Sequence, residues 1–372
     1  MKLAKAPLAM LVLTSTTLVA SNGADLSVGL PPTHQSTGVY SVQAGDIYDG
    51  KDKIRLRGVN WFGLEGQDLK LHGLWTGRTL ESFVDQVQSV GFNALRIPLA
   101  PETLKPDAPG SDGFATPLAQ LRRLLAYTRS KGMYVLLDMH SCSKNNSSNN
   151  KPGPGIGSCL AYSEDQWIND LKVLAQLSLE NPGVVGIDLF NEPYGLTWQR
   201  WKSLAEHAAS AIANVNPNVL IFVEGIGNES SPGSFGAFWG ENLFDAVNQP
   251  LEIPALRLVY SPHVYGPSVM PQPYFADAAF PANMPRIWDE HFGFLRKASA
   301  PLAIGEFGGR YVEQDKVWQD AFVAYMIDRR IDHFFYWSLN PNSADTGGLL
   351  LDDWVTLDQS KLSLLQQIFK AP

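Results

Sequence analysis

Short apolar runs alternate along this chain with segments in which apolar residues recur at helical spacing. Eight apolar runs have the length and composition of buried strands: Arg55–Asn60, Ala94–Pro98, Tyr134–His140, Val184–Phe190, Val219–Gly225, Arg257–His263, Leu302–Phe307 and Phe334–Leu339. The helical segments between them include Thr79–Val90, Pro117–Lys131, Ser163–Leu179, Thr197–Val215 and Lys316–Arg329. Strands that alternate with helices are typical of a parallel sheet joined by right-handed crossovers. Eight such units predict an α/β fold that closes into a (β/α)8 TIM barrel.

An open, doubly wound sheet is the alternative arrangement of the same elements. That fold usually carries a Gly-rich phosphate turn after an early strand, and the chain contains no G-x-G-x-x-G motif. A length of 372 residues with 45% hydrophobic content suits one barrel that carries loop insertions. We therefore expect a single catalytic domain over residues 42–372.

The first 23 residues have the three zones of a secretory signal peptide. Lys2 and Lys5 precede the apolar stretch Pro7–Ala20, which small residues follow. A membrane anchor is the alternative, but the stretch is too short to span a bilayer. We expect a secreted, extracellular protein with no membrane contact after cleavage, and the periplasm is the other location considered. Residues 24–41 are predicted to form an N-terminal extension with the polar composition of a disordered segment.

The chain has two cysteines, Cys142 and Cys159, on either side of a loop rich in Gly, Pro and Asn. In an exported protein an isolated pair of this kind is expected to form a disulfide bond. A metal site is not expected, because only His140 lies near the two thiols. The formal net charge of −8, with no basic run, also argues against nucleic acid as a partner, since a negative surface repels phosphate.

Polar side chains stand where the predicted strands end. In the segment Ile187–Tyr194 a buried-strand pattern ends in the pair Asn191-Glu192. In the segment Ala303–Gly309 a similar pattern ends at Glu306. Because a barrel builds its active site at the carboxyl ends of its strands, we expect the two carboxylates to converge on one pocket. Two convergent carboxylates are the basis of glycoside hydrolysis. Other predicted strand ends carry Arg96, Asp138, His140, His263, Tyr265 and Trp337.

These residues resemble the pattern of the retaining glycoside hydrolases of family 5, which have Asn-Glu-Pro after the fourth strand and Glu after the seventh. The similarity runs from Gly58–Gly63 to Asp345–Gly348 and the pair Asp353-Trp354. Within the family the chain looks most similar to bacterial endo-β-1,4-glucanases. The resemblance implies that Glu192 is the proton donor (acid/base) and Glu306 the nucleophile, supported by Arg96, Asn191, His263 and Tyr265, with His140 and Trp337 also in the site.

The chemistry of the reaction gives independent reasons for these roles. In a retaining hydrolase the two carboxyl groups lie about 5 Å apart, and they must differ in protonation. Glu306 should be ionised, stabilised by Arg96 if the guanidinium lies beside it and by a hydrogen bond from Tyr265. Glu192 should keep its proton near neutral pH and act as a base once Glu306 is esterified.

A polysaccharide cleft also needs groups that bind sugar. Asn191 is expected to bond a sugar 2-hydroxyl, and His140 and His263 to bond either sugar hydroxyls or the carboxylates. Among the 10 tryptophans, Trp337 is the best candidate for an aromatic platform, because it stands at a strand end. Further substrate-binding candidates are Trp61, His72, Trp75 and Asp345. Their alternative roles are packing in the core and, for Asp345, a plain turn.

The hypothesis is a secreted, monomeric endo-β-1,4-glucanase that hydrolyses internal bonds of cellulose and related β-glucans by retaining double displacement. It needs no cofactor, and its partner is the polysaccharide. A β-mannanase or mixed-linkage β-glucanase is the alternative within the family, because the same residues would serve either. A non-catalytic glycan-binding barrel is a further alternative, and the presence of both glutamates argues against it.

Overall fold

The computed structural model describes residues 35–145, 153–227, 236–298 and 300–371. The predicted signal peptide and most of the predicted extension lie outside the described residues. One end of the extension does not match the prediction, because Tyr40 and Ser41 belong to the first strand, β1.

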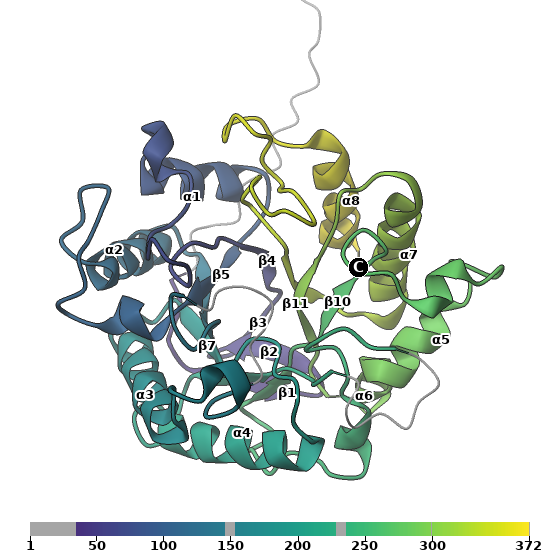
Figure 1. Cartoon of the computed structure of the whole chain (residues 1–372), viewed down its shortest axis with the longest axis horizontal. Coiled ribbons are helices and arrows are strands. Elements are labelled where there is room, and N and C mark those ends of the chain that lie inside the picture. The colour runs from purple at the N-terminus through teal and green to yellow at the C-terminus, as the bar shows by residue number, and fades with distance from the viewer. Residues whose placement is uncertain (1–34, 146–152, 228–235, 299, 372) are drawn as a thin grey trace, which may run out of the picture. The chain divides into compact units, whose positions relative to one another are not determined.

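Parallel strands form the centre of the molecule (Figure 1). They are β4 (Arg57–Asn60), β5 (Ala94–Leu99), β6 (Tyr134–Met139), β7 (Val184–Asp188), β8 (Leu220–Val223), β9 (Leu258–Tyr260), β10 (His263–Tyr265), β11 (Ala303–Gly308) and β12 (His333–Tyr336). Their order is β10-β11-β12-β4-β5-β6-β7-β8-β9. The two ends of this order, β9 and β10, are separated in the chain only by Ser261 and Pro262, and a parallel bridge joins Tyr260 to Leu302. The sheet therefore closes into a ring in which β9 and β10 form one interrupted strand, which confirms the predicted (β/α)8 barrel.

Helices surround the ring: α1 (Leu80–Ser89), α2 (Pro117–Ser130), α3 (Glu164–Glu180), α4 (Trp198–Ala213), α5 (Met284–Trp288), α6 (Phe294–Lys297), α7 (Glu313–Arg329) and α8 (Gln359–Lys370). The five predicted helical segments correspond to α1, α2, α3, α4 and α7, with bounds that differ by a few residues. Side chains of Thr79, Thr116, Ser163 and Thr197 accept hydrogen bonds from the first turns of α1 to α4, which fixes where these helices begin. Among the described helices none combines the length and the hydropathy needed to cross a membrane.

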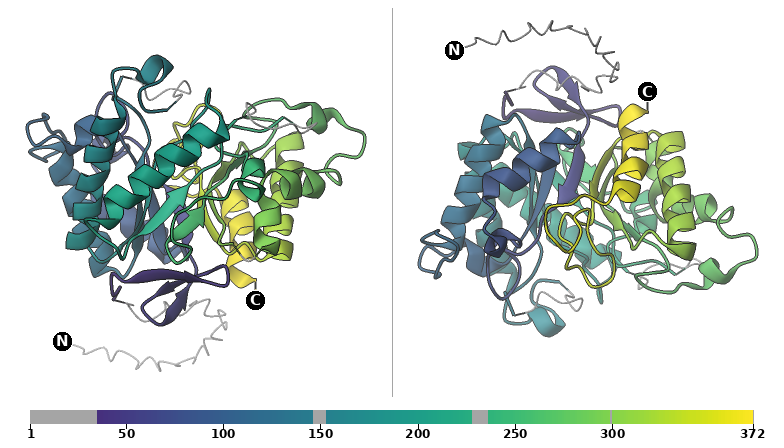
Figure 2. Two further views of the ribbon diagram at one scale, coloured as in Figure 1. Left: turned by 90° about the horizontal axis from the view of Figure 1, so that it is seen from below. Right: turned by 90° about the horizontal axis from the view of Figure 1, so that it is seen from above.

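A small antiparallel sheet, which the sequence patterns did not predict, lies across one end of the barrel (Figure 2). It consists of β1 (Tyr40–Gln43), β2 (Asp46–Asp49) and β3 (Asp52–Ile54). Its buried side chains join the apolar interior of the barrel in one cluster with Leu136, Val185, Phe222, Val259 and Phe335. A second, larger cluster fills the space between the strands and the helices. The small sheet thus closes one end of the barrel, and the other end is free to carry a site.

Phenylalanines fill the barrel interior at positions where the adjacent strand carries glycine. A Cβ atom on Gly58 would lie 2.1 Å from the Phe335 ring, and one on Gly186 would lie 2.3 Å from the Phe222 ring. Both distances are impossible for real atoms, so the two glycines are required by the packing rather than by backbone conformation.

The disulfide bond predicted from the sequence is confirmed. Cys142 and Cys159 are bonded, with their Cα atoms 5.6 Å apart. The bond closes the loop that follows β6, directly after His140. A crosslink here restrains the Gly-, Pro- and Asn-rich segment between the two cysteines.

His333, at the start of β12, makes the stability of the barrel depend on pH. Its side chain is buried, its Nδ1 accepts a hydrogen bond from Leu56 N (3.1 Å), and burial lowers its pKa to about 3. Between pH about 6.5 and about 3 the unfolded chain binds a proton at this residue and the folded chain does not. The free energy of unfolding should therefore fall by about 1.4 kcal/mol for each pH unit lowered in this window.

Denaturant titrations of the wild type and of His333→Asn at several pH values would measure this contribution. Asparagine keeps an acceptor near the Nδ1 position but does not titrate, so the variant should lose less stability on acidification. Equal pH slopes for the two proteins would show that His333 does not contribute. Buried carboxylates elsewhere affect both proteins alike and cancel in the comparison.

Candidate active site

The strand ends bring two glutamates together at the open end of the barrel. Glu306 lies in β11, where it pairs with His263 of β10, and Glu192 follows β7. One carboxylate oxygen of each glutamate and a ring nitrogen of His263 all lie within 4.8 Å of one another. Retaining glycosidases hold their two carboxyl groups about 5 to 5.5 Å apart, whereas inverting enzymes need about 6.5 Å or more to admit a water molecule. The spacing found here fits the retaining geometry.

Glu306 is held as an anion. Its side chain is only 4% exposed, Arg96 Nη1 lies 2.6 Å from its Oε1, and Tyr265 Oη donates a hydrogen bond of 2.5 Å to its Oε2. Burial alone would raise the pKa of Glu306, but His263, Arg96, His140 and the bond from Tyr265 outweigh burial and hold it below its ordinary value. Burial and the negative charge of Glu306 raise the pKa of Tyr265 well above its usual range, so the phenol keeps its proton and remains a donor.

Glu192 differs from Glu306 in exposure and in backbone conformation. Its side chain is 18% exposed, and its Oε1 lies 3.1 Å from His263 Nδ1. Its φ angle is +49°, in the left-handed region that residues with a side chain rarely adopt. Such a conformation costs of order 1–3 kcal/mol, which the surrounding structure must supply. The Glu192 N–H donates a 2.8 Å hydrogen bond to Glu224 Oε2, which helps to hold that conformation.

Arg96 is the central cation beneath the two glutamates. It is completely buried and forms ion pairs with Asp138 (3.0 Å), Asp188 (3.0 Å), Glu224 (3.2 Å) and Glu306 (2.6 Å). Burial alone would lower the pKa of Arg96, but the four carboxylates hold it well above its ordinary value. A single guanidinium cannot balance four buried anions, and accordingly burial raises the pKa of Asp188 well above its usual range and that of Glu224 to about 7.

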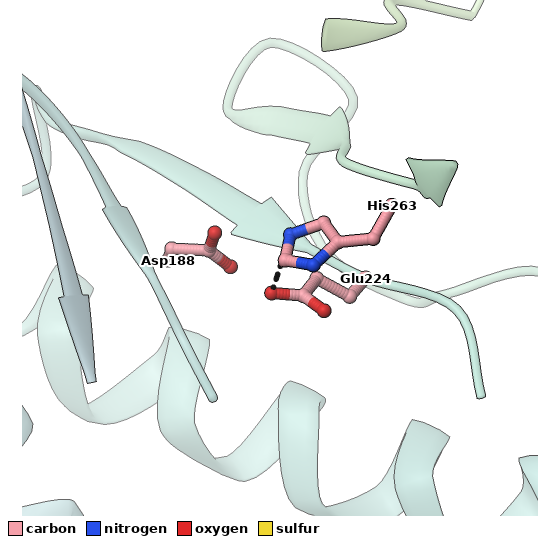
Figure 3. A group of neighbouring side chains, drawn as sticks. All are labelled: Asp188, Glu224 and His263. Carbon is pink, nitrogen blue, oxygen red and sulfur yellow. Dashed lines mark ion pairs between the residues drawn. The ribbon is translucent and has the colours of Figure 1, made fainter. Parts of the chain in front are cut away.

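His263 is the second cation of this cluster. Figure 3 shows its ring beside the carboxylates of Asp188 and Glu224, with the ion pair from its Nε2 to Glu224 Oε1 (3.1 Å) dashed. Burial alone would lower the pKa of His263, but Glu224, Glu306 and Glu192 raise it well above its ordinary value. Donor atoms of Asp188, Glu224 and His263 lie within 4.8 Å of one another, as in a metal site, but Arg96 already pairs with both of these carboxylates.

The sequence did not decide whether His140 and His263 bond sugar hydroxyls or the carboxylates, and the two residues have different surroundings. His263 contacts the carboxylates, as described above. His140 Nδ1 lies 2.6 Å from Asp138 Oδ2, a contact that fixes the orientation of the ring. The His140 ring lies nearly parallel to that of Trp337, with centroids 5.7 Å apart, and both rings line a cavity of about 400 Å³. Phe62, Glu65, Gly66, Gln67, Asp68, His72 and Asn342 complete the lining.

Asn191 and Trp337 also lie in the site, as predicted. The Asn191 side chain is buried, and its Oδ1 accepts a hydrogen bond of 3.1 Å from Arg96 Nη2. Trp337 is partly exposed, its Nε1 donates to Ser343 Oγ (3.1 Å), and its ring is nearly parallel to that of Phe62 at 5.3 Å. These contacts orient both side chains.

The other predicted substrate-binding residues are placed differently from one another. His72 lines the cavity and bonds Asn342 (3.1 Å), and Trp75 is 49% exposed with its ring edge-on to His72 at 5.1 Å. The prediction for Trp61 is wrong, because its ring is 1% exposed, packs in the core and donates to His72 O (2.9 Å). Asp345 is exposed and is not among the described residues that line the cavity.

Several residues of the site were not predicted as such, namely Glu224, Asp188, Asn60 and Phe62. Asn60 accepts a hydrogen bond of 3.0 Å from Arg96 Nη1. Glu224 is the penultimate residue of the fifth predicted strand, Val219–Gly225, and Asn60 ends the first. The rule that polar residues at strand ends build the site would therefore have found both if it had been applied to all eight strands.

Comparison with known proteins agrees with this geometry. The family model described as "Cellulase (glycosyl hydrolase family 5)" matches residues 51–343. The chain belongs to glycosyl hydrolase family 5. As a member of that family it is a glycoside hydrolase, and its barrel is the catalytic domain.

Relatives of this family 5 enzyme share most of its length. It is 42% identical over 357 residues to the "Major extracellular endoglucanase" of Xanthomonas campestris pv. campestris, covering 89% of this chain and 71% of the relative. It is 40% identical over 361 residues to an "Endoglucanase" of Paenibacillus polymyxa, covering 90% and 87%. The solved catalytic domain of the Xanthomonas enzyme superposes with a TM-score of 0.83 at 40% identity, covering 89% of this chain and 99% of that one. A cellotetraose complex of an endocellulase from Pyrococcus horikoshii gives 0.83 at 35% identity, covering 89% and 98%.

Proposed function

We propose that this family 5 enzyme is an endo-β-1,4-glucanase that hydrolyses internal bonds of cellulose and related β-glucans with retention of configuration. One observation carries the proposal: a carboxylate oxygen of Glu192, a carboxylate oxygen of Glu306 and a ring nitrogen of His263 all lie within 4.8 Å of one another. Relatives that are named endoglucanases, and a similar structure that binds cellotetraose, support the choice of substrate.

In the first step, Glu306 acts as the nucleophile. Its carboxylate attacks the anomeric carbon as the bond to the leaving oxygen breaks, and Glu192 transfers its proton to that oxygen. The products are a glycosyl ester on Glu306 and a released sugar chain with a free hydroxyl. Because Tyr265 donates to Glu306 Oε2 and Arg96 pairs with Oε1, both oxygens have a fixed position before the attack.

In the second step, water takes the place of the leaving group. Glu192, now a carboxylate, removes a proton from the water, whose oxygen attacks the anomeric carbon and breaks the ester. Two inversions give net retention. His263 Nδ1, 3.1 Å from Glu192 Oε1, stabilises the carboxylate that exists between the two steps.

The remaining polar and aromatic groups bind the sugar. Asn191 bonds the 2-hydroxyl, and His140, whose ring lies beside that of Trp337, bonds a neighbouring hydroxyl. The cavity that begins at His140 and Trp337 continues to His72, and Trp75 extends the aromatic surface beyond it. Asp345, exposed after β12, would contact only a long chain. We also propose that the protein is secreted, because residues 1–23 have the pattern of a signal peptide and the Xanthomonas relative is named extracellular.

Parallel assays on carboxymethylcellulose, mixed-linkage β-glucan and β-mannan test the substrate assignment. We expect the highest kcat/KM on carboxymethylcellulose, and a fall in viscosity that precedes most of the release of reducing ends, because internal bonds are cut. Proton NMR of the first products from a cello-oligosaccharide should show the β-anomer. Preference for mannan would overturn the substrate, and an initial α-anomer would overturn the mechanism.

A further inference from the structure

Glu224 is the one fully buried carboxyl group of the site that touches Glu192, Arg96 and His263 together among the described residues, yet the reaction steps above do not use it. It follows β8, and its side chain is 0% exposed. Its Oε2 accepts a 2.8 Å hydrogen bond from Glu192 N, and its Oε1 lies 3.1 Å from His263 Nε2 and 3.2 Å from Arg96 Nη2. A group with these contacts can control both the backbone and the side chain of Glu192.

The contact between Glu192 N and Glu224 Oε2 holds the backbone conformation of Glu192, where the chain leaves the barrel after β7. At Glu192 the chain has left β7 with φ +49°, and its N–H donates to a side chain, Glu224 Oε2 (2.8 Å). Without this carboxylate the left-handed conformation has no internal partner for its N–H, and the side chain of Glu192 would leave its position opposite Glu306.

The second contact of Glu224 acts through His263. The two ring nitrogens of His263 face different carboxylates: Nδ1 lies 3.1 Å from Glu192 Oε1, and Nε2 lies 3.1 Å from Glu224 Oε1. The contact at Nε2 is an ion pair without hydrogen-bond geometry, and the negative charge of the carboxylates around the ring favours its cationic form. Glu224 therefore keeps a positive charge beside the Glu192 carboxylate.

The surrounding chain leaves space for Glu224 and holds it. A Cβ atom on Gly240, which has φ +75°, would lie 2.5 Å from Glu224 Oε2, so this loop position admits only glycine while Glu224 is in place. Trp201 of α4 donates from Nε1 to the Glu224 carbonyl oxygen (2.9 Å). The carboxylate thus has a fixed place between the loop after β8 and the site.

We propose that Glu224 is a positioning residue for proton transfer by Glu192: one oxygen holds the left-handed backbone of Glu192, and the other holds the His263 cation that contacts the Glu192 carboxylate. This inference rests on the proposed role of Glu192 as acid/base. It assigns to Glu224 an effect on leaving-group protonation that a purely structural carboxylate would not have.

The test compares two aryl β-cellobiosides that differ in their need for a proton. Phenyl β-cellobioside requires protonation of its leaving oxygen, whereas 2,4-dinitrophenyl β-cellobioside does not. Glu224→Ala should lower kcat/KM for the phenyl substrate on the order of 100-fold, the low end of the usual contribution of a general acid. The same variant should lower kcat/KM for the dinitrophenyl substrate less than about fivefold, because proton transfer is not needed there. Glu224→Gln keeps an acceptor for Glu192 N–H but loses the charge at His263, so its effect should be smaller and of the same selectivity.

Two further variants make the result decisive. Asp188→Asn removes another buried carboxylate that pairs with Arg96 but is not bonded to Glu192 N, and it should lower kcat/KM for both substrates by the same factor. In Glu192→Ala, the ratio of the losses of kcat/KM for the two substrates gives the selectivity expected when the acid is missing.

If Glu192→Ala discriminates between the substrates and both Glu224 variants do not, the positioning role is refuted while the proposed function stands. If Glu192→Ala does not discriminate, the acid/base assignment fails and the positioning role fails with it. Glu224→Gln, which has the shape of glutamate, decides the case if the alanine variant does not fold.

Discussion

Glu306→Gly is expected to abolish the hydrolysis of β-glucans, with kcat lowered on the order of 10⁵-fold or more, the size seen when a nucleophile is removed from a covalent mechanism. The reason is that the covalent glycosyl ester cannot form once this carboxylate is removed. With 2,4-dinitrophenyl β-cellobioside, sodium azide should restore turnover, because the small anion can occupy the space that the carboxylate leaves. The product should be the α-cellobiosyl azide, identified by NMR.

The variant should remain folded, because Arg96 keeps its ion pairs with Asp138, Asp188 and Glu224 when Glu306 is removed. A circular dichroism spectrum like that of the wild type is the control. A β-configured azide would show instead that Glu306 is the acid/base and would exchange the roles of the two glutamates.

Glu192→Ala is expected to lower kcat/KM for cellotetraose by roughly 10³-fold, within the range that general acid–base catalysis contributes. With 2,4-dinitrophenyl β-cellobioside, whose leaving group needs no proton, attack by Glu306 remains intact and the glycosyl ester should form in a rapid burst. The ester should then persist, because the base that activates water is missing. Stopped-flow release of dinitrophenol and intact-protein mass spectrometry would measure both effects.

Azide provides a second check on Glu192. It should speed turnover of the Glu192→Ala variant and give the β-azide, since it attacks the ester from the side that water uses. If no burst appears and no adduct is found, Glu192 cannot be the acid. The matched Glu192→Gln variant, which keeps the volume of the side chain, separates loss of the proton from loss of shape.

The barrel could be predicted because each of its strands is an apolar run long enough to show a pattern. The small sheet β1–β3 was missed although β1 and β2 alternate buried and less buried side chains, because each has only four residues and β3 (Asp52–Ile54) buries only Ile54. The sixth strand was predicted to end at His263, but it is interrupted at Ser261 and Pro262 and resumes through Tyr265. A proline, which lacks the N–H of the ladder, marks such an interruption, but the sequence does not show that the chain continues in the same direction after it.

The two glutamates could be predicted because the rule for barrels assigns catalytic residues to strand ends, and the family pattern gave their roles. Glu224 was missed because the same rule was not applied to the fifth predicted strand; its contacts with Glu192 and His263, in contrast, arise only when the barrel closes and cannot be read from the sequence. Trp61 was placed in the cleft because it lies in a loop after a strand. Position in a loop does not reveal which way a ring points, and in this protein the ring is buried in the core.

The buried charges explain why the site has a defined structure before substrate binds. Arg96 and His263 face Asp138, Asp188, Glu224 and Glu306, and the excess of carboxylates is offset chiefly at Asp188, whose pKa burial raises well above its usual range. Such a network is costly to assemble and fixes the geometry once formed. The protein therefore supplies an ionised Glu306 without reorganisation at the moment of reaction.

Covalent trapping tests the pairing of the two glutamates most directly. The wild-type enzyme would be incubated with 2,4-dinitrophenyl 2-deoxy-2-fluoro-β-cellobioside, whose fluorine slows both steps while the leaving group drives the first. Peptide mapping by mass spectrometry should then find one fluorocellobiosyl group, attached to Glu306. A label on Glu192, or no label while the natural substrate is hydrolysed with inversion, would contradict the account.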